Sequence, residues 1–277
     1  MQPTNIDART VEGFGREWTR FDNSTMSAAE RQEIFQTYFK IFPWSQLPES
    51  AIGFDMGCGS GRWAQLVAPR VGRLHCIDAS KEALNIAKAN LAGHSNCDFT
   101  EASVGQLPLP DNSMDFGYSL GVLHHVPDIA AGVKACAAKL KRGAPMLLYL
   151  YYACDNRPVW FQLLWRLSDF GRRGISRLPF TLRHVIADAI ATLIYWPLAR
   201  TARLLEDLGA NVKNLPLAQY RRRTFYVMRT DALDRFGTAL EQRFTKKQIQ
   251  AMMEAAGLEQ IQFSDSMPFW CAVGIKK

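Results

Sequence analysis

Short apolar runs alternate with amphipathic segments along the first 150 residues of the chain. The first amphipathic segment, residues 27–42, starts with a capping-box pattern at Ser27 and Glu30 and continues with large apolar side chains at helical spacing, which predicts a helix. Five apolar runs with the length of strands follow, at 51–56, 73–77, 97–100, 114–120 and 145–152. Helical patterns lie between them, at 61–68, 81–91 and 129–140. This alternation predicts a mostly parallel sheet with helices on both faces.

The alternation stops after the fifth run and returns only near the C-terminus. Between residues 158 and 235, Leu, Ile, aromatic and Arg residues recur at helical spacing, which predicts a helical insertion. A helix at 246–256 and strand-like runs at 258–264 and 269–275 close the chain. The expected architecture is therefore a Rossmann-like α/β sheet of seven strands with an α-helical insertion.

Three parts are expected from these patterns. Residues 51–157 and 236–277 would form the sheet domain that binds the ligand. Residues 1–50 would form an N-terminal helical lid segment, and residues 158–235 a lid over the edge of the sheet where a substrate binds.

Composition adds a few constraints to this picture. With 48% hydrophobic residues over 277 positions, the chain has enough apolar material for a buried core. Its six cysteines are scattered without the Cys-x-x-Cys spacing of a zinc or redox site, so no metal is expected. Residues 1–20 lack the apolar core of a signal peptide, and the apolar segment 189–199 is too short to span a bilayer, so a cytoplasmic protein is expected.

The strongest chemical signal is a glycine-rich loop between the first strand and the next helix. Gly57, Gly59 and Gly61 allow a tight turn and a close approach of the backbone to a ligand. The spacing also fits a dinucleotide fingerprint, but a carboxylate at Asp55 would repel pyrophosphate and could pair with the ammonium group of a methionine-type ligand. A glycine turn that binds no ligand is the alternative.

A second carboxylate, Asp78, ends the second strand. A carboxylate in this place can accept hydrogen bonds from ribose hydroxyls, and the following Ala79 lies beside it. Asp78 could instead cap the helix that starts at Lys81, and both roles could coexist.

With these motifs in this order, the segment from Ile52 to Val126 resembles the class I S-adenosylmethionine (SAM)-dependent methyltransferases. The resemblance rests on the Asp-x-Gly-Cys-Gly-x-Gly loop, on the acid that ends strand two and on the stretches 101–115 and 120–128. It implies SAM as cofactor and S-adenosylhomocysteine as product, and it identifies residues 51–157 and 236–277 as the SAM-binding domain. It further implies that Glu101 faces the adenine amino group and Ala102 a ring nitrogen, although the family commonly carries Asp at the position of Glu101. We also expect Ser119 and Leu120, at the end of strand four, beside the cofactor.

Two histidines follow strand four and are candidates for a general base. Methyl transfer from a sulfonium needs mainly alignment and exclusion of water, but a hydroxyl acceptor also benefits from a group that removes its proton. His124 and His125 lie in the loop beside the cofactor, and imidazole titrates near neutrality. Either histidine could instead be structural, hydrogen-bonded to the backbone. The Asn-Pro-Pro-Tyr type signature of nucleic-acid and glutamine methyltransferases is absent after strand four.

The acceptor is expected to contact the N-terminal segment and the end of strand five. The first group of candidates consists of the lid aromatics Phe14, Trp18 and Phe21. The second consists of residues at and after strand five, namely Tyr149, Tyr151, Tyr152, Asn156 and Arg157. Successive side chains of a strand point to opposite faces, so at most one of Tyr151 and Tyr152 should face the acceptor.

Much of the basic excess, which gives the chain a net charge of +7, lies in and after the insertion. Three interpretations stay open for it: a lid with a solvated outer face, a peripheral contact with a membrane surface, or nucleic-acid binding, for which no recognition motif is visible. The charged run 231–244 could hold the insertion through ion pairs, or it could place Arg235 or Arg243 at an anionic acceptor group.

The expected function is methyl transfer from SAM to a small-molecule acceptor, with a hydroxyl oxygen preferred and an amphipathic or lipid-like substrate included. Carbon or nitrogen methylation and a catalytically silent SAM-binding subunit are the alternatives. Asp55 counts against a nicotinamide-dependent oxidoreductase. No nucleic-acid partner is expected, and the sequence does not predict the oligomeric state.

Overall fold

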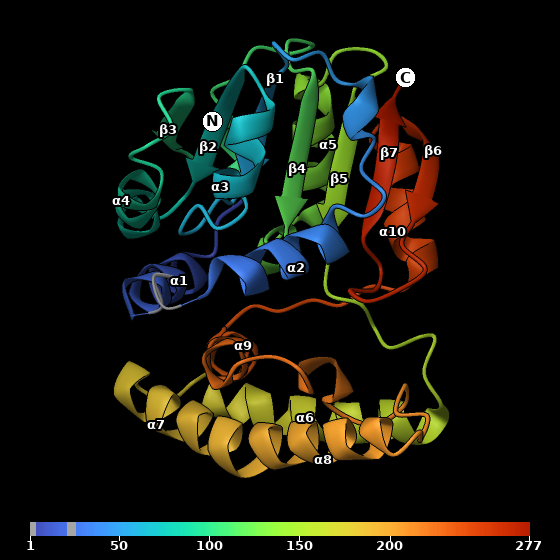
Figure 1. Ribbon diagram of the computed structural model, residues 1–277. Helices are drawn as coiled ribbons and strands as arrows, with labels where there is room; N and C mark the ends of the chain where they lie inside the picture. The colour runs from blue at the N-terminus through green and yellow to red at the C-terminus, as the bar shows by residue number, and fades with distance from the viewer. Residues whose placement is uncertain (1–3, 21–25) are drawn as a thin grey trace. The chain divides into compact units, whose positions relative to one another are not determined.

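A computed structural model describes residues 4–20 and 26–277, which divide into two compact units (Figure 1). The first unit comprises the described residues of Met1–Asn23, Ser27–Ala153 and Leu240–Lys277. The second comprises Cys154–Ala239 together with Met26. Among the described residues, no helix has both the length and the apolar character that crossing a bilayer requires.

The first unit is built on a seven-stranded sheet with the strand order β3-β2-β1-β4-β5-β7-β6. Its strands are β1 (Ile52–Met56), β2 (Arg73–Asp78), β3 (Cys97–Glu101), β4 (Phe116–Leu120), β5 (Pro145–Tyr149), β6 (Leu258–Phe263) and β7 (Ala272–Lys276). The first five strands are parallel, and β7 is antiparallel to both of its neighbours. This arrangement confirms the predicted Rossmann-like fold.

Helices cover both faces of this sheet. The helices of this unit are α1 (Ala8–Arg20), α2 (Ala28–Tyr38), α3 (Ala64–Val67), α4 (Lys81–Asn90), α5 (Ile129–Lys139) and α10 (Lys246–Ala255), with 3₁₀ turns at Trp44–Gln46, Ala68–Arg70, Val104–Gln106 and Leu123–His125, and α1 and α2 lie across the end of the strands (Figure 1). Buried side chains of α5 and α10, such as Val133 and Met253, join one core with Met146 and Leu148 of β5. Strand β5 ends at Tyr149, three residues before the end of the predicted run.

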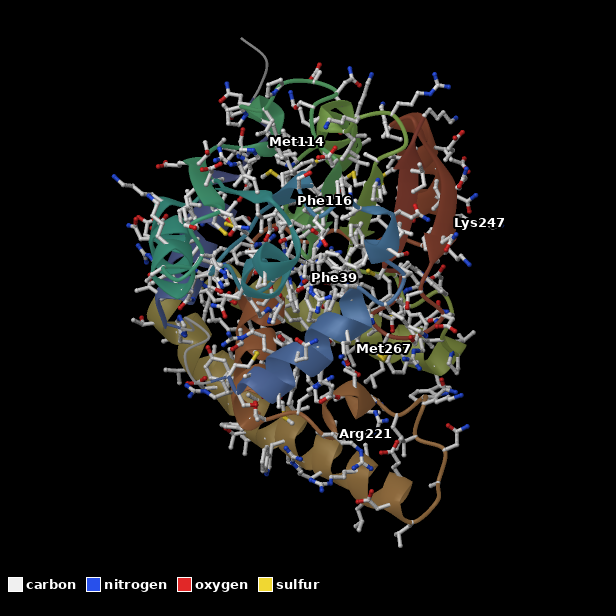
Figure 2. The ribbon with its side chains drawn as sticks, turned by 45° about the horizontal axis from the view of Figure 1, so that its top comes forward. Phe39, Met114, Phe116, Arg221, Lys247 and Met267 are labelled. Atoms are coloured by element: carbon white, nitrogen blue, oxygen red, sulfur yellow. The ribbon has the colours of Figure 1, made fainter. Side chains whose placement is uncertain are left out.

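An aromatic cluster fills the opposite face of the sheet. Phe39, which follows α2, contacts Tyr118 edge-on at 5.3 Å between ring centroids, and Phe42 contacts Phe116 at 6.1 Å. Phe39 and Phe116 lie inside the unit, whereas Lys247 lies at its surface (Figure 2). Because alternate residues of β4 point to opposite faces, Phe116 and Tyr118 face this cluster together.

The second unit is helical, as predicted for the insertion. Its helices are α6 (Val159–Ile175), α7 (Phe180–Ile190), α8 (Trp196–Asp207) and α9 (Phe225–Gly237), with a π-helical turn at Ala191–Tyr195 and a 3₁₀ turn at Ala218–Tyr220. The π-helical turn joins α7 directly to α8, so the three segments form one long helix. Residues of this long helix and of α9 form the core of the unit, with Ala191, Tyr195 and Met228 among its buried members.

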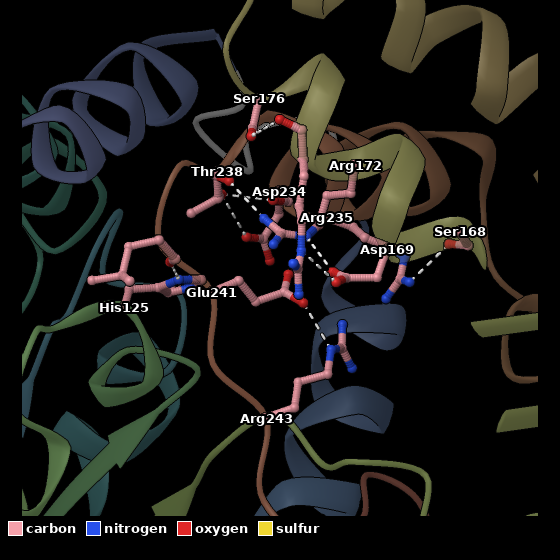
Figure 3. A network of polar contacts seen from close by, with 12 residues as sticks. His125, Ser168, Asp169, Arg172, Ser176, Asp234, Arg235, Thr238, Glu241 and Arg243 are labelled. Carbon is pink, nitrogen blue, oxygen red and sulfur yellow. Dashed lines mark hydrogen bonds and ion pairs between the residues drawn. The ribbon is translucent and has the colours of Figure 1, made fainter. Parts of the chain in front are cut away.

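Charged contacts also hold the second unit together. Asp169 accepts hydrogen bonds from both Arg172 and Arg173 within α6, and Arg172 also donates to the carbonyl of Thr238 (Figure 3). Arg235 donates to Ser168 at 2.9 Å. Arg235, predicted either to pair or to bind an anionic acceptor, thus joins two helices of its own unit.

Candidate active site

The glycine-rich loop leaves β1 at the edge where the parallel strands end. All three of its glycines have positive φ, at 81° for Gly57, 53° for Gly59 and 76° for Gly61. A side chain on Gly57 would have its Cβ 2.4 Å from the methyl groups of Val122, which follows β4. Glycine is therefore needed at position 57 for two reasons: its backbone has a positive φ, and the chain after β4 approaches it closely.

Asp55 lies under this loop as a buried carboxylate. It is 1% exposed, and its Oδ2 has no hydrogen-bond partner among the described residues. Burial raises its pKa from 3.8 to about 8, and the neighbouring Tyr118 hydroxyl opposes part of that rise. An unsatisfied carboxylate in this position is suited to accept a cationic donor such as an ammonium group.

Asp78, at the end of β2, stabilises the loop through its two oxygens. Its Oδ2 accepts the N–H of Gly59 at 2.8 Å, and its Oδ1 accepts the N–H of Ser80 at 2.9 Å. Each oxygen keeps a second lone pair, so acceptor capacity for ribose hydroxyls remains. Burial raises the pKa of Asp78, and these backbone donors oppose the rise. The cap of α4 is Ser80, not Asp78, because Ser80 Oγ accepts the N–H of Ala83.

The residues expected near an adenine ring lie at the end of β3. Glu101 is exposed and pairs with Asp78 at the last position of the β2–β3 register. Ala79 is the first residue after this pair. The N–H of Ala102, however, already donates to the Asp78 carbonyl at 3.0 Å. The next residue, Ser103, has a buried Oγ without a partner among the described residues, and no sequence signal had singled it out.

The end of β4 is hydrogen-bonded to the end of β1, directly before the glycine loop. Ser119 Oγ donates to the carbonyl of Met56 at 2.9 Å, which ties β4 to the last residue of β1. Leu120 is buried, and after it the N–H of Gly121 donates to Tyr149 of β5. Ser119 therefore positions the loop, and its hydroxyl proton is already used.

Helix α1 lies over both the glycine loop and the histidines. The Trp18 indole lies about 3.0 Å from where a Cβ on Gly59 would stand, and the Phe14 ring lies 4.9 Å from the His125 ring. Both residues thus pack against the loop and the histidine turn, and their role as lid aromatics stays a prediction. Phe21 lies outside the described residues.

The two histidines occupy different environments in a buried 3₁₀ turn. His124 is fully buried, neither ring nitrogen has a hydrogen-bond partner among the described residues, and its ring stacks on Tyr151 at 3.8 Å. Burial, with smaller effects of His125 and Arg243, holds the pKa of His124 well below 6.5. His125 Nδ1 lies 2.6 Å from the carbonyl oxygen of Leu240. A carbonyl oxygen only accepts, so Nδ1 carries the proton and the lone pair of the neutral ring is on Nε2.

Residues after β5 fall on two sides, as the alternation predicted. Tyr151 stacks on His124, and its ring lies 6.0 Å from that of Tyr149. Tyr152 instead contacts Phe269 at 5.7 Å. Tyr151 is therefore the member of the pair that faces the histidines.

A buried ion pair lies behind Tyr151. Arg243 Nε donates to Glu241 at 2.7 Å; the Glu241 side chain is 1% exposed and that of Arg243 is 14% exposed (Figure 3). The Arg243 guanidinium lies 4.9 Å from the Tyr151 ring centroid, and it also donates to the Tyr152 carbonyl. Burial lowers the pKa of Arg243, but the charge and hydrogen bond of Glu241, together with Tyr151 and Tyr149, outweigh this effect and the pKa is raised. Arg243 is therefore paired within the first unit, and both roles predicted for the charged run, holding the insertion against the sheet or binding an anionic acceptor, stay predictions.

A strap of residues 240–244 thus joins several parts of the site. Besides its bond to His125, it donates from Gln242 to the carbonyls of His124 and Val126 and from Leu240 to Thr10 of α1. Sequence reasoning missed this strap and also missed Tyr38, whose ring lies 5.2 Å from Tyr149. Only the Glu241–Arg243 spacing offered a signal for it.

The remaining predicted residues belong to the second unit. Asn156 is exposed. The Arg157 side chain donates to the Lys213 carbonyl and to Asn214, and its guanidinium lies 5.3 Å from the Phe161 ring. These contacts give Arg157 a packing role within its own unit, and an acceptor contact of either residue stays a prediction.

The hydrogen-bond acceptors of the first unit fit an adenosyl ligand with a cationic amino-acid end. Asp55 offers a buried carboxyl oxygen without a partner among the described residues, and Asp78 offers spare lone pairs. In open α/β sheets, ligands bind at the carboxyl ends of the strands, which is where these groups lie.

Comparisons with known proteins agree with this reading. A family model described as a methyltransferase domain matches residues 54–148. The chain is 33% identical over 104 residues to the uncharacterized methyltransferase YcgJ of Bacillus subtilis, covering 37% of this chain and 41% of that protein. It is 30% identical over 175 residues to the ubiquinone biosynthesis O-methyltransferase of Nitrosomonas europaea, covering 57% of this chain and 73% of that relative.

The fold is also shared with solved structures. A SAM-dependent methyltransferase of Thermotoga maritima superposes with a TM-score of 0.50 at 15% identity, covering 95% of this chain and 100% of that one. The chain spans about half the length of the first curated relatives that it matches. Since the Nitrosomonas relative is covered over most of its length and the sheet is the one that the alternation of strands and helices predicted, the chain belongs to the class I SAM-dependent methyltransferases.

Proposed function

We propose that the chain transfers the methyl group of SAM to the hydroxyl oxygen of a small amphipathic molecule. The observation that supports an oxygen acceptor is the bond between His125 Nδ1 and the Leu240 carbonyl. It holds the ring in the tautomer whose basic lone pair is on Nε2, which can take the proton of an acceptor hydroxyl. An O-methyltransferase among the relatives, from Nitrosomonas europaea, agrees with this acceptor type.

The roles of the other residues follow from their positions. Asp55 would pair with the ammonium group of the cofactor and Asp78 with its ribose hydroxyls. The bound sulfonium supplies an activated methyl group, so the chain need only align the acceptor and keep water out. Trp18 and Phe14 on α1 would exclude water from above.

Aromatic rings would hold the acceptor itself. The Tyr149 ring lies 5.2 Å from Tyr38 and 6.0 Å from Tyr151, and Tyr151 contacts both histidines. Burial raises the pKa of Tyr149 well above 10, so this hydroxyl stays neutral and can donate a hydrogen bond. Flat apolar walls with a few hydroxyl groups suit an amphipathic, ring-containing acceptor.

The variant His125→Asn tests the role of the base. The Asn amide can still donate to the Leu240 carbonyl from the position of Nδ1, but it has no basic atom in place of Nε2. We expect turnover on the true acceptor to fall about 10²- to 10⁴-fold while SAM affinity, measured by calorimetry, is unchanged. His94→Asn, at a half-exposed histidine after α4, is the matched control.

The acceptor is found by incubating the chain with methyl-labelled SAM and a cell extract and separating the products into organic-soluble, small aqueous and macromolecular fractions. We expect label in the organic-soluble fraction, as a methyl ether that is stable to mild base. Full activity of His125→Asn would refute an oxygen acceptor deprotonated by His125. SAM binding without label in any fraction would leave a silent SAM-binding subunit as the function.

A further inference from the structure

The polarity of α6 is inverted with respect to an ordinary surface helix. Leu167 is 70% exposed and Phe170 is 80% exposed, and both belong to a stripe at helical spacing that also contains Trp160 and Leu163. The charged residues Asp169 and Arg172 are buried on the opposite face, where they pair with each other. A helix of a water-soluble domain normally buries its apolar stripe and exposes its charges.

The long helix formed by α7 and α8 also exposes large apolar side chains. Its buried face consists mostly of small side chains, namely Ala187, Ala191, Ala199 and Ala202. Its outer face carries large apolar side chains, of which Leu193 is 73% exposed and Leu208 is 74% exposed. Among the described residues, all the exposed large hydrophobic side chains except Ile6 lie between Val159 and Leu208.

The positive charge of the chain is concentrated in the same region. Residues 158–235 contain thirteen Lys and Arg against six Asp and Glu, so their net charge of +7 equals that of the entire chain. The remainder of the protein is therefore electrically neutral. On α6 and just after it, Arg166, Arg173 and Arg177 are exposed beside the apolar stripe.

We propose that the exposed apolar faces of α6 and of α7–α8 dock on the surface of an anionic phospholipid bilayer. Interfacial helices combine apolar side chains that enter the acyl boundary with Arg or Lys that contact anionic headgroups, and this is the composition of both helices. Trp196 supports the assignment, because the guanidinium of Arg200 lies 4.0 Å from its ring, an arrangement suited to the headgroup level.

Two other occupants fit the surface less well. Nucleic acid would require cations on the contact face, whereas the large apolar side chains occupy it. A second copy of the chain would bring two faces of equal positive charge together, which repel each other. The docking surface goes beyond the proposed reaction, because membrane binding can be measured without any methyl transfer.

Co-sedimentation of the full chain with vesicles tests the proposal. We expect the chain to bind vesicles made of equal parts of phosphatidylcholine and phosphatidylglycerol. Binding to phosphatidylcholine alone should be at least about tenfold weaker, and about 0.5 M salt should release part of the chain bound to the anionic vesicles. The double variant Leu167→Glu/Phe170→Glu should bind about 30-fold or more weakly, since two anchoring side chains become charges. Its thermal midpoint should be unchanged because both side chains are exposed.

The matched control is Ile6→Glu/Gln262→Glu, which adds the same two charges at exposed positions of the first unit and should bind vesicles like the wild type. Wild-type chain that stays in the supernatant with anionic vesicles would overturn the proposal, and so would undiminished binding of the α6 variant. A dimer in light scattering that the α6 variant converts to a monomer, without vesicle binding, would assign the face to a second copy instead. SAM binding by all these proteins, measured separately, shows whether a failure concerns the surface or the proposed function.

Discussion

Replacing Asp55 by Asn should change the stability and the cofactor affinity of this protein in opposite directions. The carboxyl group is 1% exposed, and its pKa is raised to about 8 from 3.8. Between these two pH values the unfolded chain has lost the Asp55 proton and the folded chain has kept it. The free energy of unfolding therefore falls as pH rises, by up to about 1.4 kcal/mol per pH unit for this one group.

From pH 5 to pH 7 this amounts to about 2.7 kcal/mol, which the wild type should lose and Asp55→Asn should not. Asp78, whose pKa is also raised, contributes the same slope to both proteins and cancels in the comparison. The measurement is urea denaturation of the ligand-free proteins at pH 5, 6 and 7. Asp111→Asn, at an exposed carboxyl group, is the control and should keep the wild-type slope.

SAM binding should show the opposite dependence, because only the ionised carboxylate pairs with an ammonium group. At pH 7 about nine-tenths of the ligand-free protein still carries the Asp55 proton, so each binding event should release nearly one proton. Affinity for SAM should rise up to about tenfold per pH unit between pH 5 and pH 7, and Asp55→Asn should lack both effects. Calorimetry in two buffers of different ionisation enthalpy counts the protons. Parallel pH profiles for wild type and variant, in stability or in affinity, would refute the reasoning.

Two further substitutions test the loop and the buried histidine. Gly57→Ala should lower the free energy of unfolding by about 3 kcal/mol, because its Cβ would stand 2.4 Å from Val122 and its φ is 81°. The control is Gly121→Ala, which has a φ of 79° and open space around it and should lower the free energy of unfolding by only about 1 kcal/mol. Equal losses for the two variants in chemical denaturation would contradict the steric argument. His124→Phe should make the stability of the protein less sensitive to acid below pH 6.5. In the wild type, burial keeps His124 neutral in the folded state while the unfolded chain takes up a proton at this residue, so the free energy of unfolding falls as the pH falls. Thermal midpoints measured from pH 7 to pH 5 check this, and identical profiles for wild type and variant would contradict it.

Much of the cofactor site could be predicted because it is encoded locally. The glycine loop follows a strand within a few residues, and the carboxylates come from the ends of neighbouring strands whose edge is shared by the parallel topology. The donors that hold Asp78 were not predictable in the same way. Ser80 caps α4 in place of Asp78, because a residue two positions nearer to the helix reaches its N–H groups.

Contacts between distant segments could not be predicted. The His125–Leu240 hydrogen bond joins residues 115 positions apart, and it decides which nitrogen of the ring is basic. The strap that contains Glu241 and Arg243 reads in the sequence only as a charged run. Its burial beside Tyr151 depends on how the C-terminal segment returns to the end of β5.

By itself, therefore, the sequence determined the alternation of strands and helices, the glycine loop and the cofactor class, because these depend on side-chain periodicity and on turns made by consecutive residues. It also determined that the insertion is helical and basic. Only the tertiary structure decided which face of those helices is buried. Helical periodicity reveals two faces, but the choice between them depends on what each face packs against, and in α6 the interior received Asp169 and Arg172 while Leu167 and Phe170 were left in contact with solvent.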